Sequence, residues 1–325
     1  MSSVITIEER LTGEDRSTHL AELAVGLARE PLEIPSKLFY DHRGSALFER
    51  ITELPEYYQT RTEQALLESI ADRVVAGSGA RELLELGSGA ATKTRVLLDA
   101  MARAGTLERY LPYDFSPTTV HRVAEELAAE YPGIEVHGIV DDFVHNLNGF
   151  PAGDHRLVVF LGSTIGNFEP DSAARFLERL AAVMEPGDHF LLGADLIKSP
   201  SVIEAAYNDR EGVTAEFNRN ILRVANDLAE ADFRPELFAH RAFYDEAAHR
   251  IEMWLEATRP MRIELRALDR TLELAAGEAI RTEISTKYDR RLVTEMLDRA
   301  GFVLEEWYTD PASLFALVLA ERRPR

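Results

Sequence analysis

The chain has 325 residues, of which 46% are hydrophobic, and a formal net charge of -20. This length allows two domains or one domain with a large insertion, and the hydrophobic content is enough to bury a substantial core. The acidic balance disfavours nucleic acid and anionic membranes as partners, while the lack of cysteine excludes disulfides, thiolate catalysis and cysteine-ligated metal sites.

The N-terminal part of the chain predicts helices and an aromatic segment. The first residues are acidic and lack the long apolar run of a secretory signal, and no window of the sequence approaches the roughly 18 apolar residues of a membrane span, so we expect a cytoplasmic protein. Residues from about 17 to 31 are expected to form a helix that Pro31 ends. An aromatic-rich segment, 37–63, follows, and 63–76 is expected to be helical.

A regular alternation of short apolar runs and amphipathic stretches follows. The apolar runs predict five strands, Glu82–Leu86, Arg109–Asp114, Ile134–Val140, Leu157–Leu161 and His189–Asp195. Because helical stretches separate these strands, the pattern indicates a parallel sheet with right-handed crossovers.

The alternation changes after the fifth strand. Residues 199–230 have a helical pattern, and 238–284 alternate with period two, which predicts antiparallel strands inserted into the chain. After Asp289 the first pattern returns with a helix to Ala300. Two last strands, Phe302–Tyr308 and Leu314–Glu321, are joined by a short turn and should therefore be antiparallel.

The turn after the first predicted strand, Gly87-Ser88-Gly89, permits a ligand to approach bare backbone. It lacks the third small residue of a dinucleotide fingerprint, which leaves the class of adenosine cofactor open at this point. Asp114 ends the second strand, and a carboxylate at this place can accept hydrogen bonds from both ribose hydroxyls. Asp142 and Phe143 end the third strand. The Asp142 carboxylate can accept a hydrogen bond from an adenine amine there, and the Phe143 ring can pack on the base. Each acid taken alone is better explained as a cap or strand-end residue, but their placement at successive strand ends favours cofactor binding.

A parallel sheet completed by one antiparallel strand resembles the fold of S-adenosylmethionine-dependent methyltransferases. The expected fold class is therefore α/β: a Rossmann-like methyltransferase sheet, mostly parallel with an antiparallel last strand, and an inserted α+β substrate-binding domain. We assign 62–196 and 287–325 to the S-adenosylmethionine-binding core and 10–61 and 197–286 to the substrate-binding domain.

Several longer strings of residues narrow this resemblance. The strings are Phe39-Tyr40-Asp41 with Gly44-Ser45, Leu54-Pro55-Glu56-Tyr57-Tyr58 with Thr60-Arg61-Thr62-Glu63, Glu85-Leu86-Gly87-Ser88-Gly89, Phe160-Leu161-Gly162-Ser163-Thr164-Ile165-Gly166-Asn167, Phe217-Asn218-Arg219-Asn220 and Arg250-Ile251-Glu252-Met253-Trp254-Leu255. Over nearly its whole length the chain resembles the histidine-specific N-methyltransferases of ergothioneine biosynthesis.

The resemblance implies roles for particular residues. Those expected to bind the methyl donor are Tyr40, Gly87, Lys93, Asp114, Asp142 and Phe143. Those expected to bind the amino acid are Tyr57, Asn167 and Tyr207 at its α-amine and carboxylate, and Glu283 and Ser285 at its imidazole, with Met253 in the same sheet. Tyr40, Tyr57 and Asn167 are also expected to act in catalysis.

The activity that the resemblance implies is trimethylation of the α-amine of L-histidine to hercynine, the first step of ergothioneine biosynthesis. S-adenosyl-L-methionine would be the co-substrate and leave as S-adenosyl-L-homocysteine. The expectation includes no metal, no nucleic acid or membrane partner, and a monomeric state.

Two other functions stay open on the residues alone. One is N-methylation of a different amino acid or amine, because only Glu283 and Ser285 point to imidazole. The other is a non-catalytic module that binds an adenosine ligand, against which the set of Tyr57, Asn167 and Tyr207 argues. A nicotinamide oxidoreductase is disfavoured by the missing third glycine and by the terminal hairpin.

Overall fold

The computed structural model describes residues 3–11, 15–147 and 149–324. The chain forms two compact units. The first comprises Met1–Thr12, Arg61–Leu196 and Tyr288–Arg325, and the second comprises Gly13–Thr60 and Ile197–Lys287.

The first unit is built on an eight-stranded sheet with the order β1-β4-β3-β2-β5-β6-β13-β12. The strands β1 to β6 run parallel to one another, whereas β13 is antiparallel to both of its neighbours, β6 and β12. Their bounds are β1 Val4–Glu9, β2 Glu82–Leu86, β3 Arg109–Asp114, β4 Glu135–Val140, β5 Arg156–Phe160, β6 His189–Asp195, β12 Phe302–Thr309 and β13 Phe315–Arg322.

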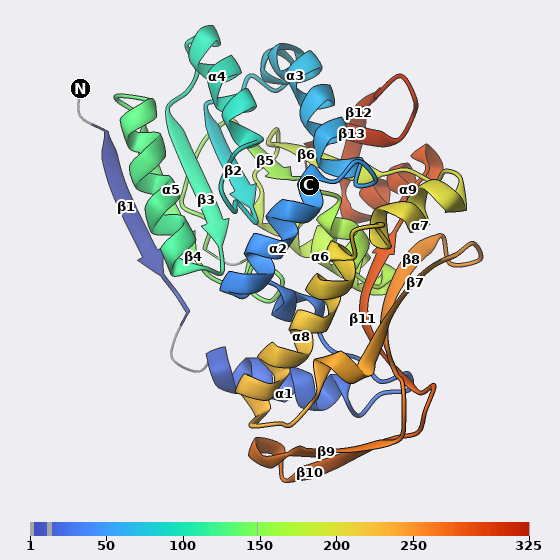
Figure 1. The fold of residues 1–325 in the computed structure, drawn as a ribbon. Helices are drawn as coiled ribbons and strands as arrows, with labels where there is room; N and C mark the ends of the chain where they lie inside the picture. Colours follow the sequence, from blue (N-terminus) through green and yellow to red (C-terminus); the bar gives the residue numbers. More distant parts are fainter. Residues whose placement is uncertain (1–2, 12–14, 148, 325) are drawn as a thin grey trace. The chain divides into compact units, whose positions relative to one another are not determined.

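Helices cover both faces of this sheet and bury it (Figure 1). One apolar layer contains residues of α3, α4 and α5, and the other contains residues of α6 and α9. The bounds are α3 Gln59–Ser78, α4 Thr94–Ala104, α5 Pro117–Glu130, α6 Pro170–Val183 and α9 Arg290–Ala300, with the short 3-10 helix η2 Thr164–Asn167 before α6. Every residue of β2, β5 and β6 is buried, which explains why their sequences are continuous apolar runs rather than alternating ones.

The expected fold class is confirmed. The five parallel strands predicted from the apolar runs are present within one or two residues of their predicted ends, and the terminal hairpin is antiparallel. The additional strand β1 was not predicted: it pairs in parallel with β4 at the edge of the sheet, and most of its side chains are exposed. An exposed edge strand has no continuous apolar run, so the signal that identified the buried strands is missing there.

The second unit combines helices with small antiparallel sheets. A three-stranded sheet has the order β11-β8-β7, and β9 pairs with β10. The strand bounds are β7 Phe238–Asp245, β8 Arg250–Ala257, β9 Met261–Leu265, β10 Arg270–Leu274 and β11 Ala279–Thr286. The helices are α1 Asp15–Gly26, α2 His42–Glu53, α7 Pro200–Tyr207 and α8 Val213–Ala229, with the 3-10 helices η1 Ser36–Phe39, η3 Pro235–Leu237 and η4 Arg266–Leu268.

The aromatic segment of the second unit contains a helix, α2, that the sequence analysis did not identify. Asp41 begins it, because its carboxylate accepts from the Gly44 N–H at 2.6 Å and from the Asn220 side-chain amide of α8 at 2.8 Å. A Cβ atom on Gly44 would lie 1.6 Å from the Phe39 carbonyl oxygen, so only glycine fits there. The motif that links Phe39, Asp41 and Gly44 therefore has a structural explanation.

In the described ranges, no helix is both long and apolar enough to cross a lipid bilayer.

Two glycine substitutions test the packing of the first unit. In Gly138→Ala, the new Cβ would lie 2.5 Å from a Val120 methyl carbon of α5, and because valine is stiff we expect a loss of about 1–3 kcal/mol in the free energy of unfolding. Gly77→Ala is the matched control: Gly77 lies in α3 with its nearest neighbour 3.7 Å from the added carbon, so a gain of about 0.5–1 kcal/mol is expected. Urea unfolding measures both, and equal effects of the two substitutions would contradict the described packing of α5 on β4.

Candidate active site

The glycine turn at the carboxyl end of β2 leaves backbone open to a ligand. Gly87 and Gly89 have φ angles of 75° and 47°, and the Gly87 N–H donates to the Tyr113 carbonyl at 2.8 Å. A Cβ added at Gly89 would meet no atom of the described chain within 4 Å, and one added at Gly87 would lie 3.6 Å from the Phe143 ring. The backbone of the turn is therefore open at Gly89, and the Phe143 ring lies beside it at Gly87.

Two polar groups accompany this turn. The Ser88 hydroxyl oxygen is buried and has no hydrogen-bond partner among the described residues. The Asp114 carboxylate, at the end of β3, accepts from the Gly89 N–H and from the Ser116 N–H, each at 3.0 Å. Desolvation raises the pKa of Asp114, and these backbone hydrogen bonds oppose the rise. An unsatisfied hydroxyl and a buried carboxylate next to bare backbone fit a polar ligand in the turn.

Glu85 fixes the direction in which the glycine turn leaves the sheet. Its carboxylate accepts from the Tyr110 hydroxyl of β3 at 2.5 Å and from the Thr94 hydroxyl at the start of α4. Burial raises the pKa of Glu85 to about 7 against the effect of these hydrogen bonds. The strands on one side of the turn and the helix on the other are thus connected through a single side chain.

Asp142 and Phe143 follow β4 in the first unit. Asp142 accepts from the Val144 N–H at 2.9 Å and contacts the His145 ring nitrogen at 2.9 Å, as expected for an acid that orders its own loop. The Phe143 ring meets the Tyr113 ring edge-on, with centroids 6.0 Å apart. The structure thus brings Phe143 to the glycine turn, and the adenine-binding role of Asp142 stays a prediction.

Glu63 of α3 organises a second loop at this edge of the sheet. Its carboxylate is 1% exposed, forms an ion pair with Lys93, and accepts from the Gly162 N–H at 2.8 and 3.0 Å. Gly162 follows β5, and the half-buried Asn167 lies in η2 a few residues further on. The predicted donor residue Lys93 is therefore held by a carboxylate to which the sequence analysis gave no role, although it lies in one of the quoted strings.

The residues expected to bind imidazole lie on β11 of the second unit. Glu283 is directly opposite Met253 of β8, and a β-bulge interrupts the pairing between Arg281 and Glu283. Beyond the bulge, Glu283 and Ser285 share one face of the strand because side chains alternate with period two. The structure thus brings Met253, Glu283 and Ser285 together in one sheet.

A buried hydrogen-bond network holds this bulge. The Thr282 hydroxyl donates to the Asn218 side-chain oxygen of α8 at 2.7 Å, and the Asn218 amide donates to the Trp254 carbonyl at 3.1 Å and to His240 Nδ1 at 2.8 Å. His240 Nε2 in turn donates to the Tyr207 carbonyl at 2.9 Å. Desolvation lowers the pKa of His240, which agrees with the neutral ring that this pattern requires. The network connects the bulge to Tyr207.

Two of the predicted tyrosines of the second unit, Tyr40 and Tyr57, contact the Phe48 ring, and the third, Tyr207, ends α7. Tyr40 meets Phe48 with ring centroids 5.7 Å apart, and Phe48 meets Tyr57 at 6.0 Å. Desolvation and then the Glu283 carboxylate raise the pKa of the Tyr40 hydroxyl, so Tyr40 lies within electrostatic reach of Glu283. Tyr40 thus belongs to the unit of the amino-acid residues, and its expected role at the methyl donor stays a prediction.

Desolvation also acts on Glu283. It raises the pKa of the half-buried carboxylate to about 7, while Lys287 lowers it. Ser285 is 3% exposed and Tyr207 is 8% exposed. Lys287 contacts both residues and was not among the residues predicted for the site.

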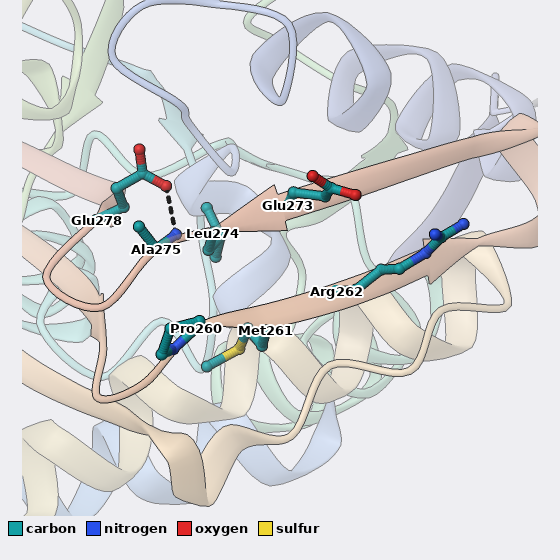
Figure 2. A pocket seen from close by; sticks show the side chains of 7 residues that line it. All are labelled: Pro260, Met261, Arg262, Glu273, Leu274, Ala275 and Glu278. Atoms are coloured by element: carbon teal, nitrogen blue, oxygen red, sulfur yellow. Dashed lines mark hydrogen bonds between the residues drawn. The ribbon is translucent and has the colours of Figure 1, made fainter.

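A shallow hollow of about 540 Å³ lies elsewhere in the second unit, along the β9–β10 hairpin (Figure 2). Glu278 accepts there from the Ala275 N–H at 2.6 Å, and Met261 and Leu274 supply apolar atoms. None of the residues expected to bind donor or amino acid lines this hollow, so it does not define the candidate site.

The sheet order and the open turn after β2 define a Rossmann-like methyltransferase. In such a sheet the ligand binds at the carboxyl edge, where the turn, Asp114, Phe143 and the loop after β5 lie. The chain belongs to the family of histidine-specific, S-adenosylmethionine-dependent methyltransferases, whose model matches residues 19–322.

Characterised relatives are similar over most of the chain. The histidine N-alpha-methyltransferase of Mycolicibacterium smegmatis is 45% identical over 93% of this chain and 94% of its own length. The protein of the same name from Mycobacterium tuberculosis is 45% identical over 95% of this chain and 97% of its own length. Ergothioneine biosynthesis protein 1 of Neurospora crassa is 32% identical over 85% of this chain, which spans 32% of that longer protein.

Replacing Asp114 by Asn tests the predicted donor site. We expect the dissociation constant for S-adenosylmethionine to rise about tenfold or more, because hydrogen bonds to a charged group contribute roughly 1.5–3 kcal/mol. Isothermal titration calorimetry measures it.

Asp188→Asn is the matched control for this substitution. Asp188 is also buried and also accepts from two backbone N–H groups, of Arg156 and Glu185, but it lies beside the amino end of β6. Donor binding should not change in this variant. Equal weakening in both variants would mean that Asp114 acts only through folding.

Proposed function

We propose that this protein transfers three methyl groups in succession from S-adenosyl-L-methionine to the α-amine of L-histidine, giving hercynine in the first step of ergothioneine biosynthesis. The observation that carries the proposal is the pair of Glu283 and Ser285 on one face of β11, with Glu283 opposite Met253, in a chain of this family. An acid and a hydroxyl spaced in this way suit the two nitrogens of an imidazole.

The residues of the first unit support binding of the methyl donor. The bare backbone at Gly87 and Gly89, the unpaired Ser88 hydroxyl and the Asp114 carboxylate fit a nucleoside with hydroxyl and amine groups. Phe143 would pack on the base, and Lys93, held by Glu63, would attract the donor's carboxylate.

S-adenosylmethionine supplies an activated methyl group, so the protein has to position the amine and keep it unprotonated. Tyr57, Tyr207 and Asn167 would bind the α-amine and carboxylate of histidine through neutral groups. Desolvation and the Glu283 carboxylate raise the pKa of Tyr40, so its hydroxyl would face the substrate in the neutral form. The product is a fixed cation, which aromatic rings such as Tyr40 and Tyr57 stabilise by roughly 0.5–2 kcal/mol.

We further propose that the enzyme works as a cytoplasmic monomer without nucleic-acid or membrane partners. The acidic composition supports the expected lack of nucleic-acid and membrane partners, because a charge of -20 repels other polyanions.

A reaction with S-adenosylmethionine and each of the twenty amino acids tests the substrate directly. Mass spectrometry should find products with one, two and three added methyl groups on histidine and on no other amino acid. Methylation of a different amino acid would replace histidine by that substrate, and donor binding without any product would indicate a non-catalytic binding module.

Glu283 predicts a pH dependence. Its carboxylate accepts an imidazole N–H only when ionised, and its pKa of about 7 means that it becomes protonated as the pH falls through 7. We therefore expect kcat/KM for histidine to fall below pH 7. Glu283→Gln should lose roughly ten- to hundredfold in kcat/KM, and its acid limb should move to lower pH, toward the usual pKa of about 6.5 of the substrate imidazole.

Steady-state kinetics across pH, with donor binding measured in parallel, checks this prediction. Glu256→Gln is the control, because Glu256 lies on β8 of the same sheet, is half-buried like Glu283, and is paired with Arg241. In Glu256→Gln the acid limb of kcat/KM and the donor affinity should both be retained. If the pH profile of kcat/KM did not change in Glu283→Gln, Glu283 would have no role in imidazole recognition.

A further inference from the structure

Lys287 is a fully buried lysine just beyond the end of β11. Its backbone N–H donates to the His249 carbonyl at 2.7 Å, which continues the strand pairing past Thr286. Two-residue spacing therefore places Lys287 on the same face as Glu283 and Ser285.

The Lys287 ammonium contacts two of the residues expected to bind histidine. It donates to the Ser285 hydroxyl oxygen at 2.8 Å and to the Tyr207 hydroxyl oxygen at 3.2 Å, and it lies 4.9 Å from the centre of the Tyr207 ring. An ammonium group has only donors, so both hydroxyls have to act as acceptors toward it. Their own protons are then directed toward other partners.

We propose that Lys287 is a positioning residue that makes the Ser285 and Tyr207 hydroxyls hydrogen-bond donors toward bound histidine, so that the site selects the neutral imidazole. This inference rests on the proposed histidine-binding roles of Ser285 and Tyr207. Ser285 donates to the unprotonated ring nitrogen, Glu283 accepts from the protonated one, and Tyr207 donates to the carboxylate.

The charge of Lys287 favours the same form of the substrate. An imidazolium would bring a second cation next to the buried ammonium and an N–H against the Ser285 proton. Lys287 also lowers the pKa of Glu283, in opposition to desolvation, and so favours the ionised acceptor. The repulsion acts through space and the pKa shift acts on Glu283, so neither effect requires Lys287 to touch the substrate.

Lys287→Met removes the ammonium and keeps most of the side-chain volume. We expect KM for histidine to rise about tenfold or more, kcat to change much less, and the dissociation constant for S-adenosylhomocysteine to stay within about twofold. The acid limb of kcat/KM should also move to higher pH, because the pKa of Glu283 rises without the lysine.

Lys198→Met is the matched control in the same unit. Lys198 makes the same two contacts with Tyr58, a hydrogen bond of 2.8 Å and an approach of 4.6 Å to the ring centre, but neither residue has a proposed role at the site. The histidine KM and the acid limb should be unchanged in this variant.

A double-mutant cycle tests whether Lys287 acts through Ser285. Ser285→Ala should raise the histidine KM in the wild-type background and have little further effect in Lys287→Met, because the hydroxyl has already lost its orientation. Strictly additive effects would contradict the proposed coupling.

The absence of cysteine permits a chemical rescue if Lys287→Met is unstable. Lys287→Cys would carry the single thiol of the chain, and bromoethylamine under denaturing conditions converts it to an amine of nearly lysine length. After refolding, with wild-type protein treated in parallel, the alkylated protein should regain the low histidine KM and the unalkylated one should not.

The outcomes separate this inference from the proposed function. If the wild-type protein did not methylate histidine, both the proposed function and the role of Lys287 would be contradicted. An active wild type with Lys287→Met unchanged in histidine KM and in acid limb, or equally weakened in donor binding, would overturn the role of Lys287 alone.

Discussion

Both faces of the parallel strands β2 to β6 are buried, so a ligand can reach this part of the sheet only at the ends of its strands. The carboxyl ends of β2, β3, β4 and β5 lie at one edge because the strands are parallel, and each ends in a polar or glycine-containing segment. The helices that bury the faces also supply groups to this edge: α3 provides Glu63, and the start of α4 provides Lys93. The chemistry of the donor site is thus a consequence of how the sheet is covered.

The second unit positions its residues differently, because an antiparallel strand presents alternate residues to opposite faces of its sheet. The bulge at Thr282 changes this phase once, and the residues after it, Glu283, Ser285 and Lys287, then share a face. Asn218 holds the extra residue by satisfying the Thr282 hydroxyl. An acceptor, a hydroxyl and a cation are therefore placed in sequence along one strand by a single irregularity that a buried amide stabilises.

Sequence reasoning predicted what depends on local pattern and missed what depends on pairing. Buried strands such as β2 and β6 were predicted to the residue because their apolar runs are continuous, whereas β1 was missed because it is an exposed edge strand without such a run. The bulge depends on the register between β8 and β11, which no local pattern encodes. Lys287 was missed for a related reason, since a lysine near a strand end is ordinarily exposed, and only the structure shows that it is buried.

Glu63 leaves no room for a side chain on the strand below it. A Cβ atom at Gly193 of β6 would lie 2.2 Å from the Glu63 carboxylate oxygen, so the acid occupies the space that any other residue at 193 would need. A larger residue at 193 would therefore displace this carboxylate, and with it the ion pair to Lys93 and the hydrogen bonds to the Gly162 N–H.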